Sequence, residues 1–346
     1  MRALLLPALC LAGLPAVAPA ATYDVSTAAA LARLVSSSAG GLRAGDTIRL
    51  AAGTYSGAFV VAVSGRKGRP ITLQGPSTAV LTNPSGYGLQ IKASYWKLTG
   101  FTVQKSLKGV VLDGANHNLI DHLTVRSIDQ EGIHLRTFSS DNVVQYSRIS
   151  HTGLGINQSP YGEGIYIGSA LSNWPVYTGG LSDKADRNCI AHNTLGPSIS
   201  AEGIDVKEGT SGGWLIANSY DRPSLTQYTM DFNGADSFLD VKGDGYIVYG
   251  NIVDNSGVDA YLRAGIQAHQ NIVAGIAYGN GNLFHMNTMS LMGTARYGFD
   301  LDTRTWGNQV CTDNTATGDT AGLSNTGTSS CSVLSPPPAC PDVLNR

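Results

Sequence analysis

The sequence is poor in charged residues, and neither sign of charge dominates. Only 14% of its 346 residues are Asp, Glu, Lys or Arg, and the formal net charge is -2. A nucleic-acid-binding protein carries a basic footprint, so this balance argues against a nucleic-acid partner. Intrinsic disorder is also excluded, because 42% of the residues are hydrophobic and a chain of this length can bury a core.

Long apolar runs are scarce as well. Beyond residue 20 no run reaches the roughly 18 apolar residues that a membrane helix needs, so we expect no membrane span. Residues 1–20 place one Arg before an apolar run and end on Ala18-Pro19-Ala20, which predicts a signal peptide. We therefore expect a secreted protein, extracellular or periplasmic, that is a monomer without a membrane partner.

Cysteine is rare, and no CxxC pair occurs, which argues against a zinc site. Cys10 falls in the predicted signal peptide, so four cysteines remain: Cys189, Cys311, Cys331 and Cys340. In an exported protein they are expected to form disulfides. The last three predict a disulfide-stapled tail over residues 311–346, and the pairing stays open.

Glycine is abundant, with 42 residues, and short β-type runs follow many of the glycines. Runs that begin at Gly88, Gly109 and Gly132 lie 21 and 23 residues apart, a period typical of solenoids. Helical periodicity is confined mainly to residues 26–38. The pattern predicts an all-β, single-domain parallel β-helix over residues 21–310 with a short N-terminal helical cap. A β-sandwich is the competing fold, but it would need frequent hairpin signals.

Asparagine recurs at the turns between these runs, at Asn193, Asn218, Asn251 and Asn287. In a stacked coil such amides can bond to the turns above and below them, so we expect these residues to be structural.

The tripeptide Glu-Gly-Ile occurs three times, starting at Glu131, Glu163 and Glu202. If the following strands stack in register, the three carboxylates form one column with a spacing of about 4.8 Å. Neighbouring carboxylates repel one another, and a cation among them relieves the repulsion. Oxygen ligands suit Ca²⁺, so we predict a calcium site at these glutamates. The alternative is that they only accept hydrogen bonds from nearby backbone N–H groups.

Two further columns are predicted to face outward beside the glutamates. Residues two positions after each glycine include His134, Tyr166, Asp205 and Asp240, and those four positions after include Arg136, Lys207 and Lys242. We expect the first group, with Trp174 from an insertion, to contact substrate.

An acidic column beside a basic one is what β-elimination on a uronate needs. A cation stabilises the enolate while a base removes the proton next to the carboxylate. Lys207 is the candidate base, because a neighbouring Lys or metal lowers a lysine pKa. Arg136 or Lys242 would then hold carboxylates of the polymer.

The segment Glu163-Gly164-Ile165-Tyr166-Ile167-Gly168, followed by Glu202 and Lys207, resembles the right-handed parallel β-helix polysaccharide lyases. It is closest to the alginate lyase and chondroitinase B type and more distantly similar to pectate lyases. The resemblance implies that the glutamates bind Ca²⁺, that Lys207 is the base and that the substrate is an acidic polysaccharide. One departure is Lys242-Gly243, where the family has an Arg.

Two other functions remain open from the residues. A glycoside hydrolase on the same face would use Asp205, Glu208 and Asp240, since its chemistry needs two carboxylates about 5–9.5 Å apart. A non-catalytic β-helix would bind glycans without cleaving them.

Overall fold

The computed structural model describes residues 19–36, 40–155, 161–221, 236–255, 262–293, 295–332, 334–335 and 337–346. The predicted signal peptide, including Cys10, lies almost entirely outside these ranges. No helix among the described residues is both long and apolar enough to span a membrane.

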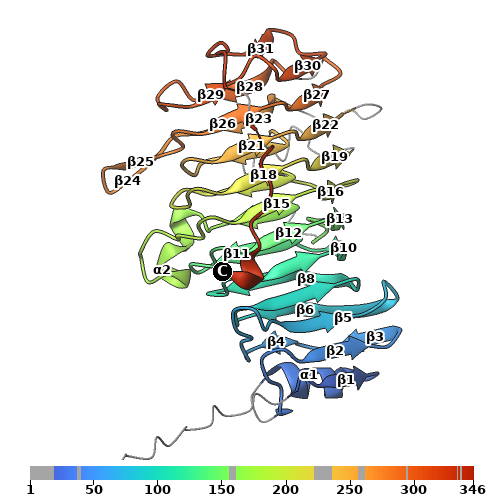
Figure 1. The fold of residues 1–346 in the computed structure, drawn as a ribbon. Helices are drawn as coiled ribbons and strands as arrows, with labels where there is room; N and C mark the ends of the chain where they lie inside the picture. The colour runs from blue at the N-terminus through green and yellow to red at the C-terminus, as the bar shows by residue number, and fades with distance from the viewer. Residues whose placement is uncertain are drawn as a thin grey trace, which may run out of the picture.

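The chain winds into a tall parallel β-helix whose coils stack from the N-terminus to the C-terminus (Figure 1). Helix α1 (Ala28–Ser36) closes the N-terminal end and buries Leu31, Leu34 and Val35, which confirms the predicted cap. The all-β fold is confirmed too. Strands of three faces follow one another in each coil, and each strand pairs in parallel with its neighbours one coil away.

The first face is an eleven-stranded sheet in the described chain. Its strands are β1 (Thr22–Val25), β2 (Thr47–Leu50), β5 (Ile71–Gln74), β7 (Trp96–Thr99), β9 (Leu119–Asp121), β12 (Val143–Gln145), β15 (Cys189–Ala191), β18 (Trp214–Ile216), β21 (Ile247–Tyr249), β26 (Leu283–His285) and β29 (Gln309–Val310).

The other two faces share the long strands β6 (Ala79–Ile91) and β8 (Thr102–Asp113). The second face adds β3 (Gly53–Ser56), β10 (Thr124–Ile128), β13 (Arg148–Ser150), β16 (Thr194–Leu195), β19 (Ser219–Asp221), β22 (Ile252–Asp254), β27 (Thr288–Ser290) and β30 (Thr315–Thr317). The third adds β4 (Val60–Val61), β11 (Ile133–Arg136), β14 (Ile165–Ile167), β17 (Ile204–Val206), β20 (Leu239–Val241), β23 (Ala264–Ala268), β28 (Tyr297–Leu301) and β31 (Gly322–Ser324).

The third face keeps the register that the sequence predicts. Ile133 pairs with Ile165, which pairs with Ile204, which pairs with Leu239. All four side chains are fully buried in one continuous core. Each contributes about 1.5–3 kcal/mol by burial, and a slip of one residue would turn the whole aliphatic set outward.

Two features go beyond the predicted repeat. A further coil, which carries β23, separates Asp240 from Asp300, and its Gln267 pairs with both residues. This coil is hard to recognise because only Ile266 is a large aliphatic in its strand. In addition, parallel pairing continues past residue 310, through β30 to β31, so the coil extends into the predicted tail.

Stacked asparagines hold the turns between the first and second faces, as predicted. Asn218 donates from Nδ2 to Asn251 Oδ1 at 3.0 Å and accepts from Asn193 Nδ2 at 3.0 Å. Asn287 and Asn314 continue the same ladder. These amides are buried and bonded on both sides, so each turn is tied to the turns above and below it.

Two insertions leave the coil at the carboxyl ends of third-face strands. The 3₁₀ helix η2 (Leu171–Asn173) and helix α2 (Trp174–Tyr177) follow β14, and an antiparallel hairpin, β24 (Asn271–Val273) and β25 (Ile276–Tyr278), follows β23. Both project from the same side of the coil (Figure 1).

The C-terminal segment returns along the first face as a strap that ends in the 3₁₀ helix η3 (Val343–Asn345) (Figure 1). Val343 packs with Val143 and Ile216, and Gly68 N–H donates to Leu344 O at 2.8 Å. A disulfide joins Cys340 of the strap to Cys189 in β15.

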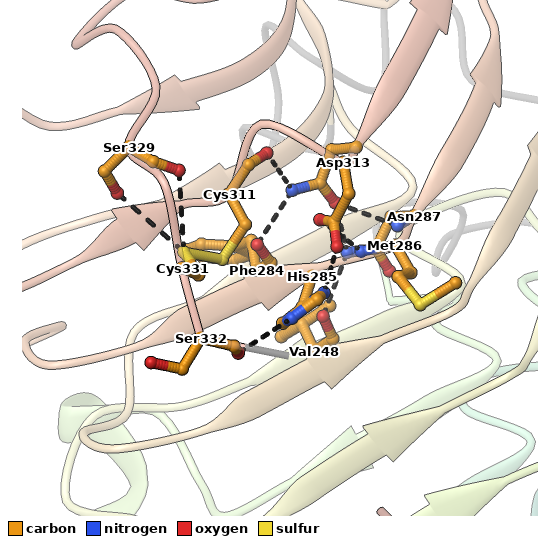
Figure 2. Close-up of a disulfide and its surroundings, with 11 residues drawn as sticks. Val248, Phe284, His285, Met286, Asn287, Cys311, Asp313, Ser329, Cys331 and Ser332 are labelled. Atoms are coloured by element: carbon orange, nitrogen blue, oxygen red, sulfur yellow. Dashed lines mark hydrogen bonds and ion pairs between the residues drawn. A yellow bond between two sulfur atoms is a disulfide. The ribbon is translucent and has the colours of Figure 1, made fainter. Parts of the chain in front are cut away.

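A second disulfide, Cys311–Cys331, lies near the C-terminal end of the coil, beside His285 and Asp313 (Figure 2). It closes a segment of 20 residues, whereas Cys189–Cys340 closes 151. All four described cysteines are therefore paired.

Replacing both cysteines of the strap tests how much it stabilises the coil. We expect Cys189→Ser/Cys340→Ser to lower the free energy of unfolding by about 2–4 kcal/mol, because the closed segment is long. Chemical unfolding followed by circular dichroism measures this loss. The matched control is Cys311→Ser/Cys331→Ser, which opens a shorter segment and should cost less; an equal or larger loss in the control would contradict the prediction.

Candidate active site

The three predicted columns form on the third face. Gly132 N–H donates to Glu163 O, and Gly164 N–H donates to Glu202 O, so Glu131, Glu163 and Glu202 follow one another on successive coils. His134 pairs with Tyr166, Tyr166 with Asp205, and Asp205 with Asp240. In the third column Lys242 N–H donates to Val206 O, which places Lys242 one coil after Lys207.

A cleft of about 900 Å³ opens over these columns. The predicted residues that line it are Glu131, His134, Glu163, Tyr166, Glu202, Asp205, Lys207, Asp240 and Lys242, and Tyr161 and Tyr177 line it too. This volume lies at the upper end of the range of about 300–1,000 Å³ that is usual for ligand-binding clefts.

A compact carboxylate cluster lies on the floor of the cleft. Oxygen atoms of Glu163, Glu202 and Asp205 all lie within 4.8 Å of one another, and all three residues are buried. Burial and the charges of Glu131, Glu202 and Asp205 raise the pKa of Glu163 well above its usual value. Burial and Asp205 raise the pKa of Glu202 to about 8.

This cluster has the donor set of a calcium site. Its ligands are all oxygen, and Glu163 Oε2 is buried without a hydrogen-bond partner among the described atoms. A divalent cation would relieve the repulsion that raises both glutamate pKa values. Glu163, Glu202 and Asp205 are therefore the residues that fit a metal.

Glu131 lies in the column but outside this cluster. Its carboxylate forms a buried ion pair with Lys108, the residue at the same position one coil earlier. Glu131 is not part of the group of three carboxylates whose oxygen atoms lie close enough together to share one cation. Lys108 was not predicted as a site residue. It directly precedes Gly109, which is equivalent to Gly132 one coil earlier, so the repeat alone places it in the glutamate column.

The two lysines form a buried network with two aspartates. Lys207 Nζ lies 2.5 Å from Asp205 Oδ2, and Lys242 Nζ contacts both Asp205, at 2.9 Å, and Asp240. Burial alone would lower the pKa of Lys207, but Asp205, Glu202 and Glu163 outweigh it and raise that pKa. The pKa of Lys242 is raised for the same reason, by Asp205 and Asp240. Without a bound cation both lysines are therefore protonated.

His269 continues the lysine column and was not predicted. It lies four residues after Gly265, just beyond β23, and lines the cleft. Its Nδ1 lies 2.9 Å from Asp240 Oδ1, and the charge of Asp240 raises the pKa of His269. It therefore adds partial positive charge to the basic side of the cleft.

His134 and Tyr166 are neutral groups on the cleft floor. Burial, with the nearby charges of Lys108 and Arg136, lowers the pKa of His134, whose Nε2 donates to Gly168 O at 2.9 Å. Burial and Asp205 raise the pKa of Tyr166, so its phenol keeps its proton. Lys207 Nζ lies 5.0 Å from the centre of the Tyr166 ring.

Two predicted site residues support the cleft without lining it. Arg136 is buried against Asp113, with Nε 2.6 Å from Asp113 Oδ1, and stacks on the Tyr177 ring at 4.1 Å. Asp113 occupies the same column one coil earlier, so Arg136 is neutralised and cannot clamp a substrate carboxylate freely. Trp174 is 2% exposed and donates from Nε1 to Ser169 O at 2.8 Å, so it anchors the insertion rather than forming a sugar platform.

The three carboxylates of the alternative hydrolase are all engaged by neighbouring groups. Asp205 and Asp240 are engaged by lysines, and Lys242 with His269 holds the pKa of Asp240 below its usual value against the effect of burial. Glu208 is 4% exposed and bonds to two loops. This arrangement leaves no acid and base pair of the predicted kind.

A second group of possible metal ligands, His285, Cys311 and Asp313, lies far along the coil (Figure 2). Cys311 is in a disulfide and offers no thiolate, and His285 Nδ1 lies 2.6 Å from Asp313 Oδ2. This group therefore forms a local histidine–carboxylate contact beside the disulfide.

Comparisons with known proteins point to one enzyme class. A solved alginate lyase from Paenibacillus sp. strain FPU-7 is 33% identical, with a TM-score of 0.78, over 89% of this chain and 99% of that protein. Pectate disaccharide-lyase of Dickeya chrysanthemi is 32% identical over 188 residues, 51% of this chain.

The chain spans only 22% of the length of that curated relative. A surface adhesin of Streptococcus pneumoniae shares the fold, with a TM-score of 0.61 over 85% of this chain and 74% of the adhesin, but only 14% identity. No model of a protein family matches the sequence.

The raised pKa of Glu202 makes stability depend on pH. In metal-free buffer the folded state keeps a proton on Glu202 up to about pH 8, whereas the unfolded chain releases it near 4.5. The wild-type protein should therefore lose stability as pH rises through this window. The free energy of unfolding of Glu202→Gln, relative to that of wild type, should therefore rise by on the order of 1–3 kcal/mol between the low-pH end and the high-pH end of this window. Urea unfolding in the presence of EDTA measures the difference.

The matched control is Glu131→Gln. It leaves the buried Lys108 without its carboxylate, so this variant should be less stable than wild type at both ends of the window. If Glu202→Gln followed the wild-type pH dependence, Glu202 would not carry the raised pKa.

Proposed function

Because the chain belongs to the right-handed parallel β-helix polysaccharide lyases, we propose that it cleaves an acidic, uronate-containing polysaccharide by β-elimination. The observation that carries this proposal is the meeting of a buried carboxylate cluster and two lysines in one cleft. Alginate is the first polymer to test, and pectate the second, because the two similar enzymes described above are named for these polymers.

The cleft supplies positive charge for the uronate carboxylates. Its described cationic side chains include Lys207, Lys242 and Arg263, with His269 beside Asp240. Lys207 and Lys242 each keep about 15% of their side chain exposed toward solvent. They are therefore placed to contact a polyanion while their own aspartates hold them in position.

Lys207 is the proposed base that removes the proton next to the carboxylate. A divalent cation bound by Glu163, Glu202 and Asp205 would withdraw charge from the substrate carboxylate and cancel the negative field that keeps Lys207 protonated. The ability of Lys207 to act as a base would therefore depend on a cation in the carboxylate cluster. Lys242 stays protonated between Asp205 and Asp240 and neutralises charge instead.

Tyr166 is the proposed proton donor to the departing glycosidic oxygen. Its phenol is neutral and lines the cleft beside Lys207, so one coil presents an acid next to the base of the following coil. Lys207 can take the proton from the carbon next to the carboxylate, and Tyr166 can give a proton to the glycosidic oxygen. Neither step then requires a free hydroxide.

We also propose that the protein acts outside the cytoplasm. Its two disulfides are stable in an oxidising compartment, where an acidic polysaccharide is accessible.

Removing the Lys207 amine should abolish turnover. We expect Lys207→Met to lower kcat/KM on the cleaved polymer by about 10²–10⁴-fold while the protein remains folded, as circular dichroism checks. The ultraviolet absorbance of the unsaturated uronate end measures the reaction. Lys92→Met, an exposed lysine outside the cleft, is the matched control and should keep full activity. Undiminished turnover by Lys207→Met would exclude it as the base, and new reducing ends without this absorbance would indicate hydrolysis.

The metal proposal is tested by binding rather than by activity. Glu163→Gln should weaken Ca²⁺ binding, measured by calorimetry on EDTA-stripped protein, by at least about 10-fold. Glu131→Gln is the control, because that carboxylate is bound to Lys108 and lies outside the cluster, and the Ca²⁺ affinity of this variant should stay close to wild type. The calcium site would be refuted if wild-type protein bound no Ca²⁺ or if both variants lost affinity equally.

A further inference from the structure

Glu208 follows the proposed base directly in sequence, yet its carboxylate is bonded to two segments outside its own coil. Oε1 accepts a hydrogen bond from Leu171 N–H at 2.6 Å, and Oε2 accepts one from Asn271 Nδ2 at 2.8 Å. The residue is 4% exposed. Neither partner is a cation, so the bonds replace solvation of the carboxylate without neutralising it.

The two partners belong to the two insertions at one edge of the cleft. Leu171 begins η2, which precedes α2, and Asn271 begins the β24–β25 hairpin. A second contact joins the same insertions, between Ser182 Oγ and Tyr278 OH at 3.0 Å. The insertions are therefore fastened to each other and to the coil that carries Lys207.

One insertion forms part of the cleft wall. Ser172, Asn173 and Tyr177 line the cleft, and the hairpin follows directly after His269, which lines it from a later coil. The wall is bonded to Glu208, and Glu208 is the residue next to Lys207 in the chain. The position of the wall relative to the Lys207 amine therefore depends on this bond. A shift of the wall would change the contacts that hold the polymer in the cleft and would therefore weaken substrate binding.

We propose that Glu208 is a positioning residue that fastens the cleft wall to the coil bearing the base, and so sets how an acidic polysaccharide is held against Lys207. This inference rests on the proposed function. A buried carboxylate bonded only to neutral donors stabilises less than an apolar side chain of similar size would, which argues for a geometric role.

Removing the Glu208 side chain risks unfolding the insertions. The test therefore introduces a negative charge at its hydrogen-bond partner, Asn271. Asn271→Asp sets two carboxylates against each other across the 2.8 Å contact and detaches the hairpin. Adding Glu208→Gln restores an amide–carboxylate bond with donor and acceptor exchanged. In the double variant the new side-chain amide donates its N–H to the carboxylate at position 271, and its carbonyl oxygen still accepts the hydrogen bond from Leu171 N–H.

We expect N271D to raise KM for the cleaved polymer by about 10-fold, with kcat changed much less. The freed hairpin no longer steadies the substrate-binding wall through the Ser182–Tyr278 contact, whereas Lys207 stays in place. The double variant E208Q/N271D should recover most of the wild-type KM. Circular dichroism and the thermal midpoint check that both variants fold. A merely structural role would lower the thermal midpoint or the active fraction, and would not separate KM from kcat.

Two results would overturn the inference: a wild-type KM in N271D, or a folded double variant that recovers nothing. These two results differ from failure of the proposed function. If the proposed function were wrong, the wild-type protein itself would yield no unsaturated product from alginate, pectate or other uronate polymers.

Discussion

The cleft and its charged side chains depend on one constraint: successive coils stack so that their strands pair in a fixed register. The spacing between neighbouring strands is about 4.8 Å, so side chains at equivalent positions are forced into contact along the coil. Buried aliphatics such as Ile165 and Ile204 and the ladder through Asn218 enforce that register. A shift of one residue would turn the glutamates and lysines away from the cleft and the core outward.

Close stacking of charge has an electrostatic consequence. Glu163, Glu202 and Asp205 repel one another, while Lys207 and Lys242 neutralise Asp205. The same negative field therefore raises the pKa of the buried glutamates and keeps the lysines protonated. Carboxylates and lysines titrate as one network, and a cation that enters the carboxylate cluster would shift the proton affinity of the whole network. In the proposed mechanism, metal binding and the strength of Lys207 as a base would therefore be coupled by geometry.

Several polar residues of this face hold structure rather than substrate. Arg136 pairs with Asp113 and supports Tyr177, Trp174 anchors its insertion, and Glu208 bonds two insertions. The cleft combines a rigid floor built from coil strands with a wall built from insertions. Such a wall needs specific bonds to the floor, because loops pack less apolar surface than the coil does.

The sequence by itself determined the β-helix, the N-terminal cap and the columns of Glu163, Glu202 and Lys207, because repeats of period 21–23 with alternating aliphatics bury a continuous core when they stack. Only the tertiary structure decided which charges pair. Lys108 neutralises Glu131, and Asp113 neutralises Arg136, because side-chain partners come from the neighbouring coil, many residues away. The coil carrying His269 was visible only in three dimensions, because Ile266 is the one large aliphatic in its strand.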